Sequence, residues 1–111
     1  MIRRSKYGNV KVKADGYTFD SKMEYRRYQN LKLLQQAGEI SGLVVHPWWS
    51  ICINDVNVCK VIADFRYFVG PTWRLSIVED CKGRDNALSK LKRKLLKAAH
   101  GIDMVLIEKT R

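Results

Sequence analysis

The amino-acid sequence predicts a single α/β domain, in which a mixed β-sheet is flanked by helices. A chain of 111 residues with 46% hydrophobic residues can form one core and is the size of one domain. Two segments with helical periodicity alternate with short apolar runs of strand length. The last such run follows the second helix closely, so a right-handed crossover would place it parallel to an earlier strand.

The first third of the chain is expected to form a small hairpin followed by a helix. Two short alternating segments flank Asp15-Gly16, which is a hairpin turn signal. Ser21 and Glu24 then match the S-x-x-E capping box, which predicts the start of a helix over residues 21–37.

The rest of the chain is expected to supply further antiparallel strands, a second helix and a final strand. The predicted strands cover residues 10–13, 17–19, 40–45, 48–53, 58–68, 73–82 and 102–107, and the second helix covers residues 87–99. Gly70-Pro71 separates the two longest strands. Asn86 can cap the second helix, and Gly101 ends it.

Composition narrows the classes of function. Lys and Arg number 21 against 11 Asp and Glu, a net charge of +10 that favours a phosphate backbone as partner. No apolar run approaches the roughly 20 residues that span a bilayer, and no signal-peptide core follows the basic N-terminus. We therefore expect a cytoplasmic protein with no membrane partner.

The three cysteines lack C-x-x-C spacing, which argues against a disulfide framework or a zinc site.

Three acidic residues stand where the pattern calls for apolar ones. Asp64 lies inside an apolar strand, and Asp80 ends another strand two residues before Lys82. Glu24 falls on the apolar stripe of the first helix. Half-buried acids are costly unless they are paired, protonated or bound to a metal. In a strongly basic chain, they predict a metal site that faces a polyanion.

Strand geometry suggests how this site is built. Asp80 and Lys82 share one face of their strand. If the strands that carry Asp64 and Asp80 are hairpin neighbours, the two carboxylates approach each other, and a divalent cation relieves their repulsion. Two carboxylates, the backbone carbonyl of Cys81 and waters suit Mg²⁺, with Mn²⁺ as the alternative. Glu24 can add a carboxylate, and Lys82 can activate water or stabilise charge on a phosphate.

Each candidate also has an ordinary structural interpretation. Glu24 can serve only the capping box, and we expect one rotamer to exclude the other role. Asp80 and Lys82 can form a simple ion pair worth about 0–1 kcal/mol at a surface. Glu79 replaces Asp80 at the site if the register slips by one residue. His46 can be a general base, although a structural role suits a loop histidine better.

The ordered set of segments resembles a known nuclease superfamily. Asp64 followed by Asp80-Cys81-Lys82, with a preceding helical Glu24, is similar to the PD-(D/E)XK signature of restriction-endonuclease-like nucleases. The chain carries Ala63 where that signature has proline. Residues 6–9, 19–24, 63–67 and 78–83 resemble a small phage- and prophage-borne family described as Holliday-junction-resolvase-like. This resemblance covers nearly the whole chain.

The resemblance implies a restriction-endonuclease-like core and Mg²⁺-dependent hydrolysis of phosphodiester bonds, with Glu24, Asp64, Asp80 and Lys82 as the catalytic residues. Our leading hypothesis is an endonuclease that cuts branched DNA. A four-way junction has two-fold symmetry, so such an enzyme is expected to be a homodimer. A nicking or restriction-type nuclease on linear duplex, and a DNA-binding module without catalysis, are the alternatives.

Basic residues in two segments are the candidate DNA contacts. Arg3, Arg4 and Lys6 belong to a basic N-terminal arm over residues 1–8. Lys90, Lys94 and Lys97 fall on one stripe of the second helix and can follow a phosphate backbone. An ordinary solvated helix face is the other interpretation of this stripe.

Overall fold

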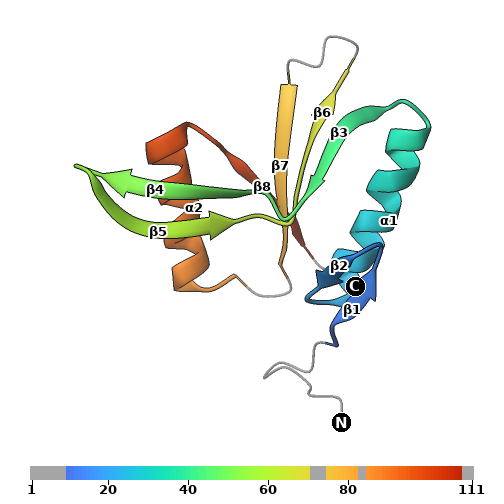
Figure 1. Ribbon diagram of the computed structural model, residues 1–111, viewed down its shortest axis with the longest axis horizontal. Helices are drawn as coiled ribbons and strands as arrows, with labels where there is room; N and C mark the ends of the chain where they lie inside the picture. Colours follow the sequence, from blue (N-terminus) through green and yellow to red (C-terminus); the bar gives the residue numbers. More distant parts are fainter. Residues whose placement is uncertain (1–9, 71–74, 83–84, 109–111) are drawn as a thin grey trace.

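The computed structural model describes residues 10–70, 75–82 and 85–108 and has a mixed α/β fold (Figure 1). The elements in chain order are β1 (Val12–Ala14), β2 (Tyr17–Phe19), α1 (Lys22–Gln36), β3 (Ile40–Val45), β4 (Trp48–Ile53), β5 (Val56–Ile62), β6 (Phe65–Val69), β7 (Leu75–Lys82), α2 (Ala87–His100) and β8 (Met104–Glu108). This order agrees with the predicted one except that the strand predicted over residues 58–68 is two strands, β5 and β6. The predicted basic arm, with Arg3, Arg4 and Lys6, lies outside the described residues.

A mixed four-stranded sheet with strand order β3-β6-β7-β8 forms the centre of the fold. β6 pairs antiparallel with both β3 and β7, whereas β8 pairs parallel with β7. α2 connects these two parallel strands, which is the crossover that the sequence predicts. The hairpin of β1 and β2 is a separate small sheet at the N-terminal end of α1 (Figure 1).

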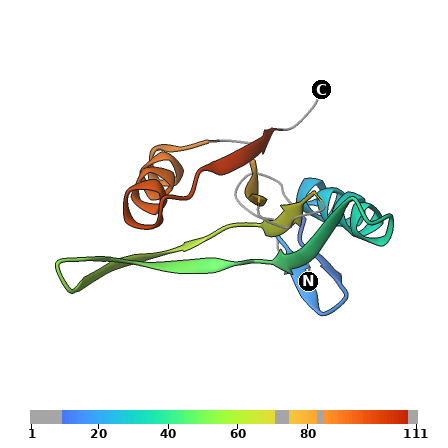
Figure 2. The same cartoon turned by 90° about the horizontal axis from the view of Figure 1, so that it is seen from above.

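The prediction of one continuous strand over residues 58–68 is wrong. The strand is interrupted at Ala63-Asp64. β5 pairs with β4 in a two-stranded ribbon, while β6 joins the central sheet. At the break, the Ala63 N–H donates to the Pro47 carbonyl, and the His46 N–H donates to the Asp64 carbonyl, both at 2.9 Å. The ribbon therefore leaves the sheet as a unit and projects away from it (Figures 1 and 2).

The helices begin and end at predicted caps. The Ser21 hydroxyl accepts a hydrogen bond from the Glu24 N–H at 3.1 Å, and the Asn86 side chain accepts one from the Ser89 N–H at 2.8 Å. Gly101, with φ of +70°, closes α2 in the left-handed conformation that suits glycine. Within the described part of the chain, neither helix has the length and apolar character needed to cross a membrane.

Two hydrophobic clusters stabilise the fold, one on each side of β7. The larger one packs α1 and the hairpin against the central sheet and contains Phe19, Tyr28, Leu31, Ile40, Phe65 and Tyr67. The smaller one packs α2 against the ribbon and contains Ile51, Val61 and Leu96. α1 and α2 consequently lie on opposite sides of β7 (Figure 1).

Candidate metal centre

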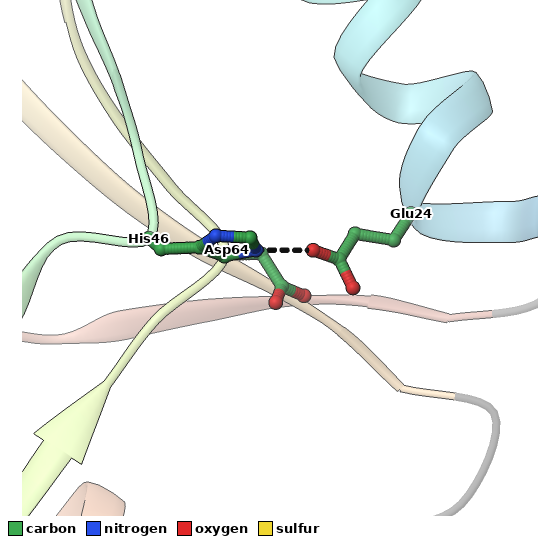
Figure 3. Close-up of side chains that lie close together, drawn as sticks. All are labelled: Glu24, His46 and Asp64. Atoms are coloured by element: carbon green, nitrogen blue, oxygen red, sulfur yellow. Dashed lines mark hydrogen bonds and ion pairs between the residues drawn. The ribbon is translucent and has the colours of Figure 1, made fainter. Parts of the chain in front are cut away.

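Three side chains that are distant in sequence meet where the ribbon leaves the sheet. Glu24 comes from the first turn of α1, His46 from the turn between β3 and β4, and Asp64 from the break between β5 and β6. One potential ligand atom of each lies within 4.8 Å of those of the others. Glu24 reaches across from the helix toward the other two (Figure 3). The group can hold a metal ion.

Glu24 divides its two carboxylate oxygens between helix capping and this group. Its Oε2 accepts a hydrogen bond from the Asp20 N–H at 3.1 Å, and its Oε1 lies 2.8 Å from His46 Nε2 (Figure 3). One rotamer of Glu24 therefore reaches both the helix N-terminus and His46, because its carboxylate bonds the Asp20 N–H, one residue before the N-cap Ser21. Its role as a metal ligand stays a prediction. Burial raises the pKa of Glu24, and the contacts with His46 and Asp20 oppose that rise.

Asp64 is fixed to the neighbouring strand by two backbone contacts. Its N–H donates to the Glu79 carbonyl at 3.2 Å, and its Oδ2 accepts a hydrogen bond from the Cys81 N–H at 2.6 Å. Phe65 pairs with Glu79 in the antiparallel ladder, so Asp64 and Asp80 are the next residues along the two strands. Asp64 thus approaches Asp80 as the sequence predicts, although from a strand break rather than from within a strand.

The electrostatics of Asp64 suit a bound cation. Burial, followed by the negative charges of Asp80 and Glu24, raises the pKa of Asp64 to about 9. In the absence of a cation, the carboxyl group therefore retains its proton at neutral pH. Two carboxylates and an imidazole in a half-buried site form a reasonable donor set for a divalent metal. The residues present fit such an ion.

Asp80 and Lys82 share a face and form an ion pair next to this group. Lys82 Nζ lies 2.8 Å from Asp80 Oδ2, and the Asp80 side chain is almost completely buried. Asp80 is not one of the three clustered ligand residues, but it is near enough to influence the pKa of Asp64. The pair places a lysine ammonium at the edge of the candidate metal centre.

Glu79 does not compete with Asp80 for the site, because it points to the opposite face of β7. Its carboxylate is bound by the forked guanidinium of Arg27, with Nη2 at 2.9 Å from Oε2, and it accepts a hydrogen bond from the Tyr67 hydroxyl at 2.6 Å. Burial, followed by the hydrogen bond to Glu79 and its negative charge, raises the pKa of Tyr67 to about 12. The charge of Glu79 is thus paired with that of Arg27, and both of its carboxylate oxygens accept hydrogen bonds within the larger cluster.

The Cys81 backbone contributes to the site through its N–H, which fixes Asp64. The predicted role of its carbonyl oxygen as a metal ligand stays a prediction. Burial, followed by the charge of Asp64, raises the pKa of the Cys81 thiol to about 12. The thiol is therefore protonated at neutral pH and is not an activated nucleophile.

Two residues contact the acids of this region in ways that the sequence did not predict: His46, which was considered only as a general base, and Arg27. His46 has φ of +55°, an unusual conformation for a residue other than glycine, and this conformation turns its ring toward Glu24. Its position between two strands and before Pro47 was the available signal. Arg27 lies one helical turn after Glu24, but its partner Glu79 is 52 residues away, and no local pattern reveals such a contact.

The basic stripe of α2 lies apart from the acidic group. Lys90 and Lys94 are exposed, and Lys97 forms an ion pair with Asp103 at 2.7 Å. Their predicted contact with DNA stays a prediction. The half-buried cations of this helix are instead Lys92 and Arg93.

Comparison with known proteins assigns a family to the chain. The family described as a protein of unknown function, DUF1064, matches residues 4–107. The chain belongs to the DUF1064 family. No curated protein and no solved structure matches the chain. The match to the DUF1064 family includes every described residue of the candidate metal centre.

Proposed function

We propose that this DUF1064 protein is a metal-dependent endonuclease that hydrolyses phosphodiester bonds in DNA, with a restriction-endonuclease-like core. One observation carries the proposal: Asp64 lies beside Asp80 at the end of the β6–β7 ladder, with Glu24 and His46 on one side and Lys82 on the other. This combination of acids and a lysine is what the resemblance to the PD-(D/E)XK nucleases leads one to expect.

Glu24, His46 and Asp64 would hold the metal ion, with Asp80 beside them. A divalent cation supplies positive charge to a phosphate oxygen and lowers the pKa of a coordinated water. Carboxylates suit both Mg²⁺ and Mn²⁺, whereas an imidazole ligand favours Mn²⁺ over Mg²⁺. We therefore propose Mg²⁺ or Mn²⁺ as the cofactor and expect Mn²⁺ to bind more tightly.

Hydrolysis adds the oxygen of a water molecule to phosphorus, breaks the bond from phosphorus to a sugar oxygen, and requires a proton for that leaving oxygen. Lys82 is suited to the charge that develops in this step. Its ion pair with Asp80, at 2.8 Å, fixes the position of the ammonium group. We assign Lys82 to stabilising negative charge on the phosphate, because a preorganised cation contributes most where charge develops.

The net charge of +10 supports a nucleic acid as the substrate. We propose branched DNA on the basis of the resemblance, and a homodimer, because two symmetric cuts in a junction require two sites. Light scattering with and without junction DNA tests the dimer. A protein that stays monomeric in both samples contradicts it.

Cleavage of a labelled four-way junction tests the proposed function. The reactions contain Mg²⁺, Mn²⁺ or chelator, with the wild type, Asp80→Asn, and Asp55→Asn as a matched control in an exposed turn. We expect metal-dependent nicks that Asp80→Asn abolishes and Asp55→Asn preserves. The component linear duplexes are cut in parallel, and equal cleavage of them favours the nicking or restriction-type alternative. Tight binding without cleavage in any metal overturns the enzyme and leaves a DNA-binding module.

A further inference from the structure

A small cavity of about 50 Å³ lies on the α2 side of Asp80, apart from the Glu24, His46 and Asp64 group. Residues of β5, β7, α2 and β8 line it. Its polar lining consists of Asp80, Lys82, Ser89, Lys92 and Arg93. The cavity and the candidate metal centre therefore share the Asp80–Lys82 pair as a common wall.

Two of the three cations at this cavity are already neutralised. Lys82 pairs with Asp80 at 2.8 Å, and Arg93 makes two parallel contacts of 2.7 Å with Asp85. Lys92 makes no ion pair with any residue in the described ranges, although its side chain is partly buried. The cavity consequently carries an excess of one positive charge, which an anion from outside can neutralise.

The position of the cavity at the start of α2 adds to its preference for an anion. Ser89 lies in the first turn of the helix, where the helix dipole is positive, and Lys92 follows one turn later. A hydroxyl and an ammonium group are common partners of phosphate oxygens in contacts to a nucleic-acid backbone. The remaining walls are the apolar side chains of Val61, Ile62 and Met104.

We propose that this cavity binds a backbone phosphate of the DNA strand adjacent to the phosphate that is cleaved, and that Lys92 and Ser89 hold it. This inference rests on the proposed function, because the shared wall of Asp80 and Lys82 relates the two positions. In this proposal, the DNA backbone runs along the side of α2 that carries Ser89 and Lys92. The exposed stripe of Lys90, Lys94 and Lys97 then faces away from the phosphate that is bound here.

The salt dependence of DNA binding tests the subsite without requiring cleavage. Binding of a fluorescent four-way junction is followed by anisotropy in chelator between 50 and 200 mM NaCl, for wild type, Lys92→Gln, Lys92→Arg and Ser89→Ala. Lys94→Gln removes the same charge from the exposed side of the helix. For Lys92→Gln, we expect the slope of log affinity against log salt to decrease in magnitude by about 0.9, the value of one phosphate contact.

We expect Lys92→Arg to retain the slope, Ser89→Ala to weaken binding with the slope unchanged, and Lys94→Gln to change the slope by less than half as much as Lys92→Gln. Equal effects of Lys92→Gln and Lys94→Gln overturn the subsite, because they indicate general charge attraction. Thermal unfolding of each variant identifies any loss of fold.

The subsite and the nuclease fail separately. A protein that cuts DNA but shows no effect of Lys92→Gln on the slope lacks the subsite. A protein that shows this effect but never cuts DNA lacks the activity.

Discussion

Glu79 and Asp80 are adjacent acids on one strand, and they belong to two different parts of the molecule. Glu79 faces α1, where Arg27 and Tyr67 bind both of its carboxylate oxygens. Asp80 faces α2, where its partner is Lys82 and where a second carboxylate, Asp64, lies nearby. Glu79 therefore has a full set of partners, whereas Asp80 lies between a second carboxylate, Asp64, and the cations Lys82, Lys92 and Arg93.

The difference indicates which acids are structural. A fully bonded carboxylate within an aromatic cluster fixes the register of β7 and leaves no capacity for a ligand. Burial, followed by the negative charges of Asp80 and Glu24, raises the pKa of Asp64, and a bound metal ion would relieve this repulsion. The larger cluster therefore positions the acids, and the smaller α2 side supplies the cations around them.

The largest expected effect is on catalysis. Asp64→Asn should reduce single-turnover cleavage by about a thousandfold or more, because a catalytic metal contributes several kcal/mol of transition-state stabilisation. The variant should remain folded, since the amide has nearly the same shape and removes a repelling charge. Cleavage within tenfold of the wild type would contradict the proposed role of Asp64 in metal binding.

The next effect is on stability, on the α1 side. Arg27→Ala should lower the free energy of unfolding by about 3 kcal/mol, because it leaves the buried Glu79 charge without its partner. Urea denaturation measures the change, and Arg26→Ala on the exposed side of the same helix is the control. We expect Arg27→Ala combined with Glu79→Gln to lose less stability than the sum of the single variants. A loss below about 1 kcal/mol for Arg27→Ala would show that Glu79 is no more dependent on its partner than a surface acid.

The pH dependence of the metal-free protein is a smaller effect for each pH unit. The folded pKa of Asp64 is about 9 and its ordinary value is 3.8, so between these values the folded chain retains a proton that the unfolded chain has lost. Stability should therefore fall as pH rises from 5 to 8, by at most about 1.4 kcal/mol per pH unit for this one group. Denaturation in chelator at several pH values measures the slope. Asp64→Asn should reduce it, and an unchanged slope would contradict the raised pKa.

The smallest effect concerns metal preference. His46→Gln should weaken Mn²⁺ binding by about tenfold or more and Mg²⁺ binding by less, because the imidazole nitrogen favours Mn²⁺. Titration calorimetry with each metal gives both affinities. His100→Gln is the control, since His100 contacts the Ser50 carbonyl on the ribbon and lies outside the acidic group. Equal losses for the two metals would assign His46 to orienting Glu24 rather than to binding the ion.

Local signals in the sequence predicted much of the fold. The caps at Ser21 and Asn86, the final glycine of α2 and the parallel crossover are all determined by short-range pattern and chain handedness. The approach of Asp64 to Asp80 followed from the turn between their strands. The break at Asp64 was missed because the apolar run from β5 to β6 is nearly continuous, and a strand that changes sheets has no distinct periodicity.

The unpredicted parts of the site depend on tertiary contacts. The orientation of His46 results from a positive φ that no residue type in its neighbourhood requires. The inward position of Lys92 depends on α2 packing against the ribbon through Leu96, while Leu88 and Leu91 are left 60% and 52% exposed. Helical periodicity alone assigns these leucines to the core and therefore does not predict that Lys92 is partly buried.

Calorimetric titration of the chelator-treated protein with Mn²⁺, in buffers of different ionisation enthalpy, tests the central claim most directly. We predict saturable binding to each chain with release of protons at pH 7, because a cation must displace the proton that Asp64 retains. Asp64→Asn should lose binding while Asp55→Asn, in an exposed turn, preserves it. Failure of the wild type to bind either Mn²⁺ or Mg²⁺, or equal binding by Asp64→Asn, would contradict a metal centre built on Glu24, His46 and Asp64.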